Sequence, residues 1–89
     1  MEALRSLWKQ KGPDLLVELS SRGTASFSEL LRVGGNPHTV TRRLGEFVRA
    51  GFATRSVEQD AKRTVTYRIT PLGRKVARKV QELQEILLS

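Results

Sequence analysis

The sequence contains no cysteine, a single histidine and no long apolar run. Without cysteine, the chain cannot form a disulfide framework, a thiolate metal site or a thiol redox sensor. One histidine excludes the clusters of histidines that bind zinc or copper. The longest apolar runs are only three or four residues, too short to cross a bilayer, and the N-terminus lacks the apolar core of a signal peptide. We therefore expect a cytoplasmic protein with no metal and no other cofactor.

Acidic residues are scarce relative to basic ones. The 89 residues carry sixteen Lys+Arg against nine Asp+Glu, which gives a net charge of +7 and a pI near 10.9. The excess is uneven, because residues 1–35 carry a net charge of +1, residues 36–79 of +8 and residues 80–89 of −2. Such a concentrated positive charge points to a polyanionic partner, either nucleic acid or an anionic membrane. A basic surface that only keeps the protein solvated is the alternative.

Glycine and proline divide the first third of the chain into helical segments. Leucines at helical spacing predict a short helix over residues 2–10 and a second helix that ends before Gly23. Pro13 either ends the first helix or occupies the first turn of the second. Ser26-Phe27-Ser28-Glu29 has the pattern of a capping box, which predicts the start of a third helix.

A fourth helix is predicted over residues 36–51, with Asn36 as its N-cap, Pro37 in its first turn and Gly51 at its end. Its apolar residues form a narrow stripe, so the opposite face should be exposed to solvent. The stripe consists of Val40, Leu44, Phe47 and Val48, and the predicted exposed face of His38, Thr39, Arg42, Arg43, Glu46 and Arg49.

The pattern then changes from helical spacing to alternation. Residues 64–70 alternate between apolar and polar side chains, which predicts a half-buried strand, and residues 52–58 are its predicted hairpin partner. The loop between the two strands is polar, with Lys62 and Arg63 at its tip. A last, long helix is predicted over residues 71–88, with an apolar seam along one side.

The predicted fold class is mostly α with a small antiparallel β-hairpin (α+β), in a single domain over residues 1–89. Two helices joined by a glycine-bearing turn and followed directly by a hairpin form the winged helix-turn-helix pattern, here with an extended C-terminal helix. We expect the domain to bind DNA, with residues 36–51 as its recognition helix, residues 52–70 as its wing hairpin and residues 71–88 as a C-terminal helix for dimerisation.

Four segments, spread over about three quarters of the chain, carry a family resemblance. They are Ser26-Phe27-Ser28-Glu29-Leu30, Asn36-Pro37 with Thr41-Arg42-Arg43-Leu44, Ala50-Gly51-Phe52-Ala53-Thr54-Arg55, and Tyr67-Arg68-Ile69-Thr70-Pro71-Leu72-Gly73. In this order and spacing they resemble winged helix-turn-helix transcriptional regulators of bacteria and archaea, most closely the HxlR-like group and more loosely the MarR-like group. HxlR-like regulators usually carry a cysteine near the N-terminus, and its absence here removes thiol sensing from what the resemblance implies.

The resemblance implies a protein that binds duplex DNA. The recognition helix would enter the major groove, and the wing would reach the adjacent minor groove or its phosphates. Arg42 and Arg43 are the first candidates for contacts, because a guanidinium can bind guanine O6 and N7 through two hydrogen bonds, although contact with phosphates alone is an equal alternative. Arg55 and Arg68 can flank the same backbone. The predicted DNA-binding residues are His38, Thr39, Arg42, Arg43, Arg49, Arg55, Lys62 and Arg63.

The apolar seam of the last helix extends beyond what a small core needs, which predicts a homodimer. A two-fold dimer would place two recognition helices about 34 Å apart, one turn of DNA, and would match a palindromic operator. The alternative is that the first and last helices pair within one chain. The predicted interface residues are Leu4, Leu7, Trp8, Val80, Leu83 and Leu87.

The leading hypothesis is a homodimeric transcriptional regulator that acts on duplex DNA in the nucleoid. We do not expect an enzyme, because the only histidine lies on the predicted DNA face and no serine is placed with a base and an orienting group. The alternatives are a non-specific architectural DNA-binding protein and a winged helix that binds other proteins. RNA binding has less support because the sheet lacks stacking aromatics beyond Tyr67, and a membrane partner is not expected because the last helix ends in acidic residues.

Overall fold

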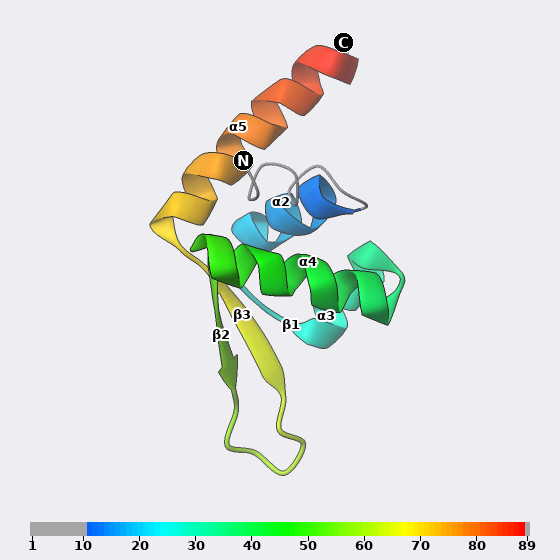
Figure 1. Ribbon diagram of the computed structural model, residues 1–89, viewed down its shortest axis with the longest axis vertical. Coiled ribbons are helices and arrows are strands. Elements are labelled where there is room, and N and C mark those ends of the chain that lie inside the picture. The colour runs from blue at the N-terminus through cyan, green and yellow to red at the C-terminus, as the bar shows by residue number, and fades with distance from the viewer. Residues whose placement is uncertain (1–10, 89) are drawn as a thin grey trace.

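The computed structural model describes residues 11–88, so the helix predicted over residues 2–10 lies outside the described part of the chain. The elements follow in the order α2 (Gly12–Arg22), β1 (Thr24–Ser26), α3 (Phe27–Gly34), α4 (Pro37–Ala50), β2 (Ala53–Val57), β3 (Val65–Ile69) and α5 (Pro71–Leu88). Figure 1 shows α2, α3 and α4 packed together above the sheet, with the β2–β3 hairpin projecting at one end and α5 at the other. The predicted winged helix-turn-helix fold is confirmed.

The sheet has three strands, where the sequence predicts only a hairpin. Strand β1 pairs antiparallel with β3, which gives the strand order β1-β3-β2. Three residues are too few for an alternating pattern to stand out in the sequence, which explains why β1 was not predicted. Because β1 pairs with residues 66–68 of β3 and does not reach the loop over residues 58–64, the base of the wing belongs to the core sheet and its tip projects freely.

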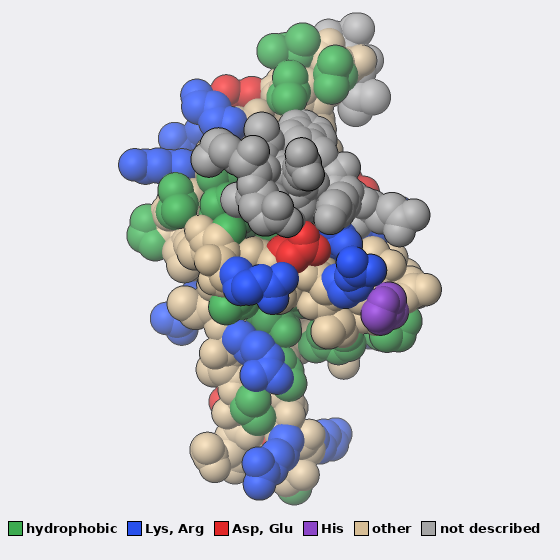
Figure 2. Space-filling model, in the orientation of Figure 1, with side chains coloured by type: hydrophobic (Ala, Val, Ile, Leu, Met, Phe, Trp, Pro, Cys, Tyr) green, Lys and Arg blue, Asp and Glu red, His purple; other side chains and the backbone are tan. Residues whose placement is uncertain are grey.

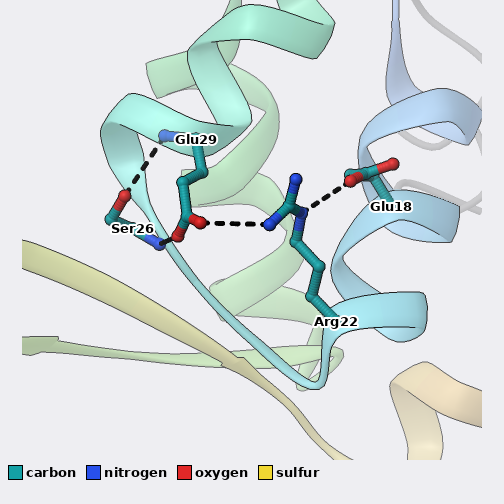
Figure 3. A network of polar contacts seen from close by, with 4 residues as sticks. All are labelled: Glu18, Arg22, Ser26 and Glu29. Atoms are coloured by element: carbon teal, nitrogen blue, oxygen red, sulfur yellow. Dashed lines mark hydrogen bonds and ion pairs between the residues drawn. The ribbon is translucent and has the colours of Figure 1, made fainter.

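The turn from α2 into α3 is fixed by a network of charged side chains (Figure 3). The Ser26 hydroxyl accepts from the Glu29 N–H at 3.2 Å, and the Glu29 carboxylate accepts from the Ser26 N–H at 2.9 Å, which confirms the predicted capping box. From α2, Arg22 donates to Glu18 at 2.6 Å and to Glu29 at 3.0 Å. The Ser26 hydrogen bonds lower the pKa of the Glu29 carboxyl, and Arg22 lowers it further. The hydrogen bond to Glu18 raises the pKa of Arg22.

The hydrophobic core lies where the three central helices meet. Helix α4 contributes Val40, Leu44 and Phe47 to it, as its apolar stripe predicts, and β3 covers it with Tyr67 and Ile69. The largest side chains without exposed surface are Phe47, Leu15, Leu16, Leu19, Leu30, Leu44 and Val40. The core therefore holds α4 through one face only and leaves its other face to solvent.

A short junction joins the end of α4 to the start of α5. The Thr70 hydroxyl donates to the Gly51 carbonyl oxygen at 2.6 Å and accepts from the Gly73 N–H at 3.0 Å, so one side chain serves both helix ends. A Cβ at Gly73 would overlap the carbonyl oxygen of Phe52, which makes glycine necessary at this position. These contacts fix the direction of α5 relative to α4.

The first half of α5 packs on α2, and its second half projects beyond the other helices (Figure 1). Val80 is only 3% exposed and belongs to the core of its own chain, so its assignment to a dimer interface is wrong. The four-residue spacing between Val76 and Val80 places both on the side of α5 that packs against the core. Leu4, Leu7 and Trp8 lie outside the described residues. Among residues 11–88, no helix combines the length and the apolar character needed to span a membrane.

Candidate nucleic-acid interface

Helix α4 begins at a tight side-chain cap. The Asn36 side-chain oxygen accepts from the backbone N–H of His38 at 2.9 Å and of Thr39 at 3.2 Å, and Pro37 occupies the first turn. The predicted cap is therefore confirmed. It places His38 on the exposed surface and leaves Thr39 half-buried, so the first turn presents two polar side chains to solvent.

The two adjacent arginines of α4 lie in different environments. Arg42 is exposed, as predicted, but Arg43 is only 5% exposed. Position 43 follows Val40 by three residues and precedes Phe47 by four, which puts it on the core side of a helix with 3.6 residues per turn. The prediction that Arg43 lies on the exposed face of α4 is therefore wrong, and its guanidinium is not available for a first contact with DNA.

The buried Arg43 forms an ion pair within its own helix. Its Nη1 lies 3.1 Å from Oε1 of Glu46, whose side chain is only 13% exposed, so Glu46 is also less exposed than predicted. The geometry is not that of a hydrogen bond, and within the described residues neither Nε nor Nη1 of Arg43 has a hydrogen-bond partner. Burying charged groups is costly unless their hydrogen bonds are satisfied. We therefore expect the Arg43–Glu46 ion pair to add little to the free energy of unfolding.

The register of the wing separates its two strand arginines. Arg55 lies opposite Tyr67, whereas Arg68 lies opposite Thr54. Directly opposed residues of an antiparallel pair share a face, and neighbours along a strand alternate. Arg55 therefore projects from the face of the sheet on which Tyr67 joins the core under the helices, and Arg68 projects from the other face. Because they project from opposite faces of the sheet, Arg55 and Arg68 cannot flank the same stretch of DNA backbone, contrary to what the sequence suggested.

The tip of the wing is an ordered loop. The Asp60 backbone oxygen accepts from the Arg63 N–H at 3.2 Å, and its carboxylate accepts from both the N–H and the hydroxyl of Thr64 at 3.2 Å. The hydrogen bond from the Thr64 N–H is the main cause that lowers the pKa of the Asp60 carboxyl. Arg63 adopts a left-handed conformation with φ of 51°, and both Lys62 and Arg63 are exposed.

Asp60 was not among the predicted site residues. The signal that could have identified it is an Asp in a short polar loop between two strands, because Asp side chains accept hydrogen bonds from backbone N–H groups a few residues further on. Its contacts show that the acidic group inside the basic wing is used within the loop.

The remaining predicted cations lie on the surface of the protein. Figure 2 shows Lys and Arg side chains over α4 and along the wing, with the single histidine at one end of α4. None of these cations forms an ion pair with another residue in the range 11–88. The exposed residues are His38, Arg42, Arg49, Arg55, Lys62 and Arg63. Over the same range, no three His, Asp or Glu side chains gather into a potential metal site.

Comparisons with known proteins identify the family and agree with the winged helix-turn-helix fold. The profile of the HxlR-like helix-turn-helix family matches residues 6–88. Among solved structures, the chain is similar to the regulator ytfH from Salmonella typhimurium, with 31% sequence identity and a TM-score of 0.86 over 97% of this chain and 78% of that one. A search of curated protein sequences gives no match.

Two further solved structures show how widely the fold is shared. A MarR-family regulator from Enterococcus faecalis V583 has 27% identity and a TM-score of 0.78, over 93% of this chain and 76% of that one. Diamide-treated YodB from B. subtilis has 22% identity and a TM-score of 0.75, over 93% of this chain and 83% of that one. The second likeness supports the fold alone.

Proposed function

Because the chain belongs to the HxlR-like helix-turn-helix family of transcriptional regulators, we propose that it binds duplex DNA through the exposed face of α4 and the wing. The observation that carries the proposal is the set of exposed cations on α4 and the wing that no described carboxylate neutralises. Such a surface gains affinity by releasing the counterions condensed on DNA. The proposed site of action is therefore the chromosomal DNA in the cytoplasm.

Helix α4 is the element that reads base sequence in this proposal. A recognition helix enters the major groove with its N-terminal residues against the base edges. His38, Thr39 and Arg42 lie in the first two turns of α4, and Arg42 is the only arginine among them. Its guanidinium can bind guanine O6 and N7 together, which discriminates against other bases by about 1–3 kcal/mol. Arg49, in the last turn, contacts phosphate.

The wing supplies contacts that do not depend on sequence. Lys62 and Arg63 are exposed in the loop at the tip of the hairpin, where they meet the minor groove or its phosphates. Arg55 lies nearer to the base of the wing, on the face of the sheet that carries the core. These side chains add affinity and fix the register of α4 on the duplex.

Selection of bound sequences from a random duplex pool tests this function. We expect a shared sequence motif, and a binding constant for the selected duplex that exceeds that for random duplex by about 10³ or more. Equal affinity for all duplexes would replace sequence-specific regulation with architectural binding. Failure to retain any duplex at low salt would refute DNA binding and favour a protein partner.

The exposed leucines of α5 support a homodimer as part of the proposal. Leu83 and Leu87 are 39% and 70% exposed, on the half of α5 that projects from the domain. A two-fold pairing of these helices would bury both leucines and place two copies of α4 about one DNA turn apart, roughly 34 Å. The selected duplex should then contain two inverted half-sites.

Leu83→Asp tests the dimer, because it puts a charge into the proposed apolar contact. We expect a monomer by sedimentation and, for a duplex with two half-sites, a loss of affinity of about 10²-fold or more. Gln81→Asp is the matched control, since it introduces the same charge at an exposed position on the opposite side of α5. A Leu83→Asp protein that stays dimeric would contradict the proposed interface.

A further inference from the structure

The wing tip contains an acid where the proposed function calls for positive charge. Asp60 lies two residues before Lys62 and three before Arg63, in a loop whose side chains are exposed except for the half-buried Thr64. A carboxylate at this position repels a nearby phosphate and lowers the net positive charge of the wing. On electrostatic grounds alone, Asp60 would weaken DNA binding.

The contacts of Asp60 give it a second role. Its carboxylate and its backbone oxygen together accept three hydrogen bonds, from the N–H of Arg63 and from the N–H and hydroxyl of Thr64. These bonds close the chain around Lys62 and hold Arg63 in a left-handed conformation that a residue with a side chain rarely adopts unaided. A further hydrogen bond, from the Thr66 hydroxyl to the Glu58 carboxylate at 3.0 Å, joins the two sides of the hairpin next to the loop.

We propose that Asp60 is a positioning residue for DNA binding, and that its hydrogen bonds fix the loop so that Lys62 and Arg63 present their charges together to the phosphate backbone. The inference rests on the proposed function. A fixed loop avoids the entropy cost of ordering two long cationic side chains and their backbone at the moment of binding.

Two substitutions that change the charge equally separate the effect of the Asp60 hydrogen bonds from the effect of its charge. Asp60→Asn and Asp60→Ala each remove one negative charge. Asparagine keeps a side-chain oxygen that can accept from the Thr64 N–H, and its amide can donate to the Thr64 hydroxyl, whereas alanine loses both interactions. Any difference in DNA affinity between the two variants therefore measures the hydrogen bonds.

The test measures binding of the selected duplex to the 89-residue chain over a range of salt concentrations. We expect Asp60→Asn to bind at least as tightly as the unsubstituted protein, and Asp60→Ala to bind roughly three- to tenfold more weakly than Asp60→Asn. For Asp60→Ala, the slope of log affinity against log salt concentration should be smaller than for Asp60→Asn, by about the contribution of one phosphate contact. Equal affinities of the two variants would overturn the inference.

A thermodynamic cycle shows whether Asp60 acts through the two cations. In a Lys62→Ala/Arg63→Ala background, we expect Asp60→Ala and Asp60→Asn to bind equally well, and a persisting difference would refute the positioning role. All variants are compared far below their melting temperatures, so that every protein is folded. Asp60→Ser keeps a single acceptor oxygen, and its duplex affinity should lie between those of Asp60→Ala and Asp60→Asn.

The same measurements separate the inference from the function on which it rests. If the unsubstituted protein binds no duplex at low salt, the proposed function fails. If it binds duplex and the two Asp60 variants do not differ, DNA binding stands and only the positioning role is lost.

Discussion

The α2–α3 region and the α4–wing region use their arginines differently. In the first region, Arg22 joins two carboxylates that link the end of α2 to the start of α3 (Figure 3). In the second, Arg42 and Arg55 face solvent and pair with no carboxylate among the described residues. The difference shows that Arg22 serves the fold, while Arg42 and Arg55 are exposed and available to a partner.

Arg43 is the exception that sharpens this comparison. It belongs to the basic half of the sequence, yet it is buried and lies against Glu46. Net charge by segment therefore overstates the charge that a partner can reach. The positions of single residues on α4, and not the total charge, decide which cations belong to the interface.

The largest effect is expected from Arg42→Ala. Loss of a base-contacting guanidinium should weaken binding of the selected duplex by about 1–3 kcal/mol, or roughly 5- to 150-fold, and relax the preference at one base pair. Fluorescence anisotropy with the selected duplex and single-base variants of it measures both quantities.

Arg43→Met/Glu46→Met is the matched control, because it removes the adjacent arginine together with its partner. We expect unchanged duplex affinity, and a free energy of unfolding that is unchanged or higher. A loss of affinity as large as that of Arg42→Ala would break the distinction between the exposed and the buried arginine.

A smaller effect is expected from Arg55→Ala. Loss of one phosphate contact should weaken binding roughly two- to fivefold and lower the slope of log affinity against log salt by about one. Arg68→Ala is the control, since the same residue type on the opposite face of the hairpin should leave the slope unchanged. Equal effects of the two substitutions would mean that DNA does not distinguish the faces of the wing.

Arg22→Gln should affect stability and not DNA binding. The arginine is exposed and joins half-buried carboxylates, so solvent screens both ion pairs and the free energy of unfolding should fall only slightly. Urea denaturation measures this change, and anisotropy should give the same duplex affinity as for the unsubstituted protein. Reduced affinity in a fully folded Arg22→Gln protein would extend the DNA interface into the α2–α3 region.

The smallest effect is expected from pH acting on Glu29. Its pKa is lowered in the folded protein, chiefly by the hydrogen bonds from Ser26, so the ionised carboxylate stabilises the fold. This stabilisation is complete above the ordinary pKa of glutamate, about 4.3, and is lost as the pH falls through the lower pKa of the folded state. Melting temperatures of Glu29→Gln and unsubstituted protein should converge at acidic pH; a constant difference would contradict the assignment.

Local signals in the sequence were sufficient to predict most of the fold. Asn36, Gly51 and the capping box at Ser26 act through the backbone within a few residues, so the ends of α3 and α4 could be predicted without knowledge of the tertiary structure. Strand β1 could not, because its three residues become a strand only by pairing with β3, which is distant in the sequence.

The candidate site was predictable in outline but not in its details. A stripe of four apolar residues left Arg43 at the edge of the core face, and its burial depends on what packs beside it. The opposite directions of Arg55 and Arg68 depend on the register of the hairpin. The role of Asp60 depends on a loop conformation that composition alone does not specify.

NMR titration of the labelled protein with the selected duplex tests the central claim most directly. We expect the largest shifts of backbone amide signals at the first two turns of α4 and at the tip of the wing, with the signals of α2 and α3 nearly unchanged. Shifts centred on α2 and α3, or no shifts at a duplex concentration that saturates binding, would contradict it.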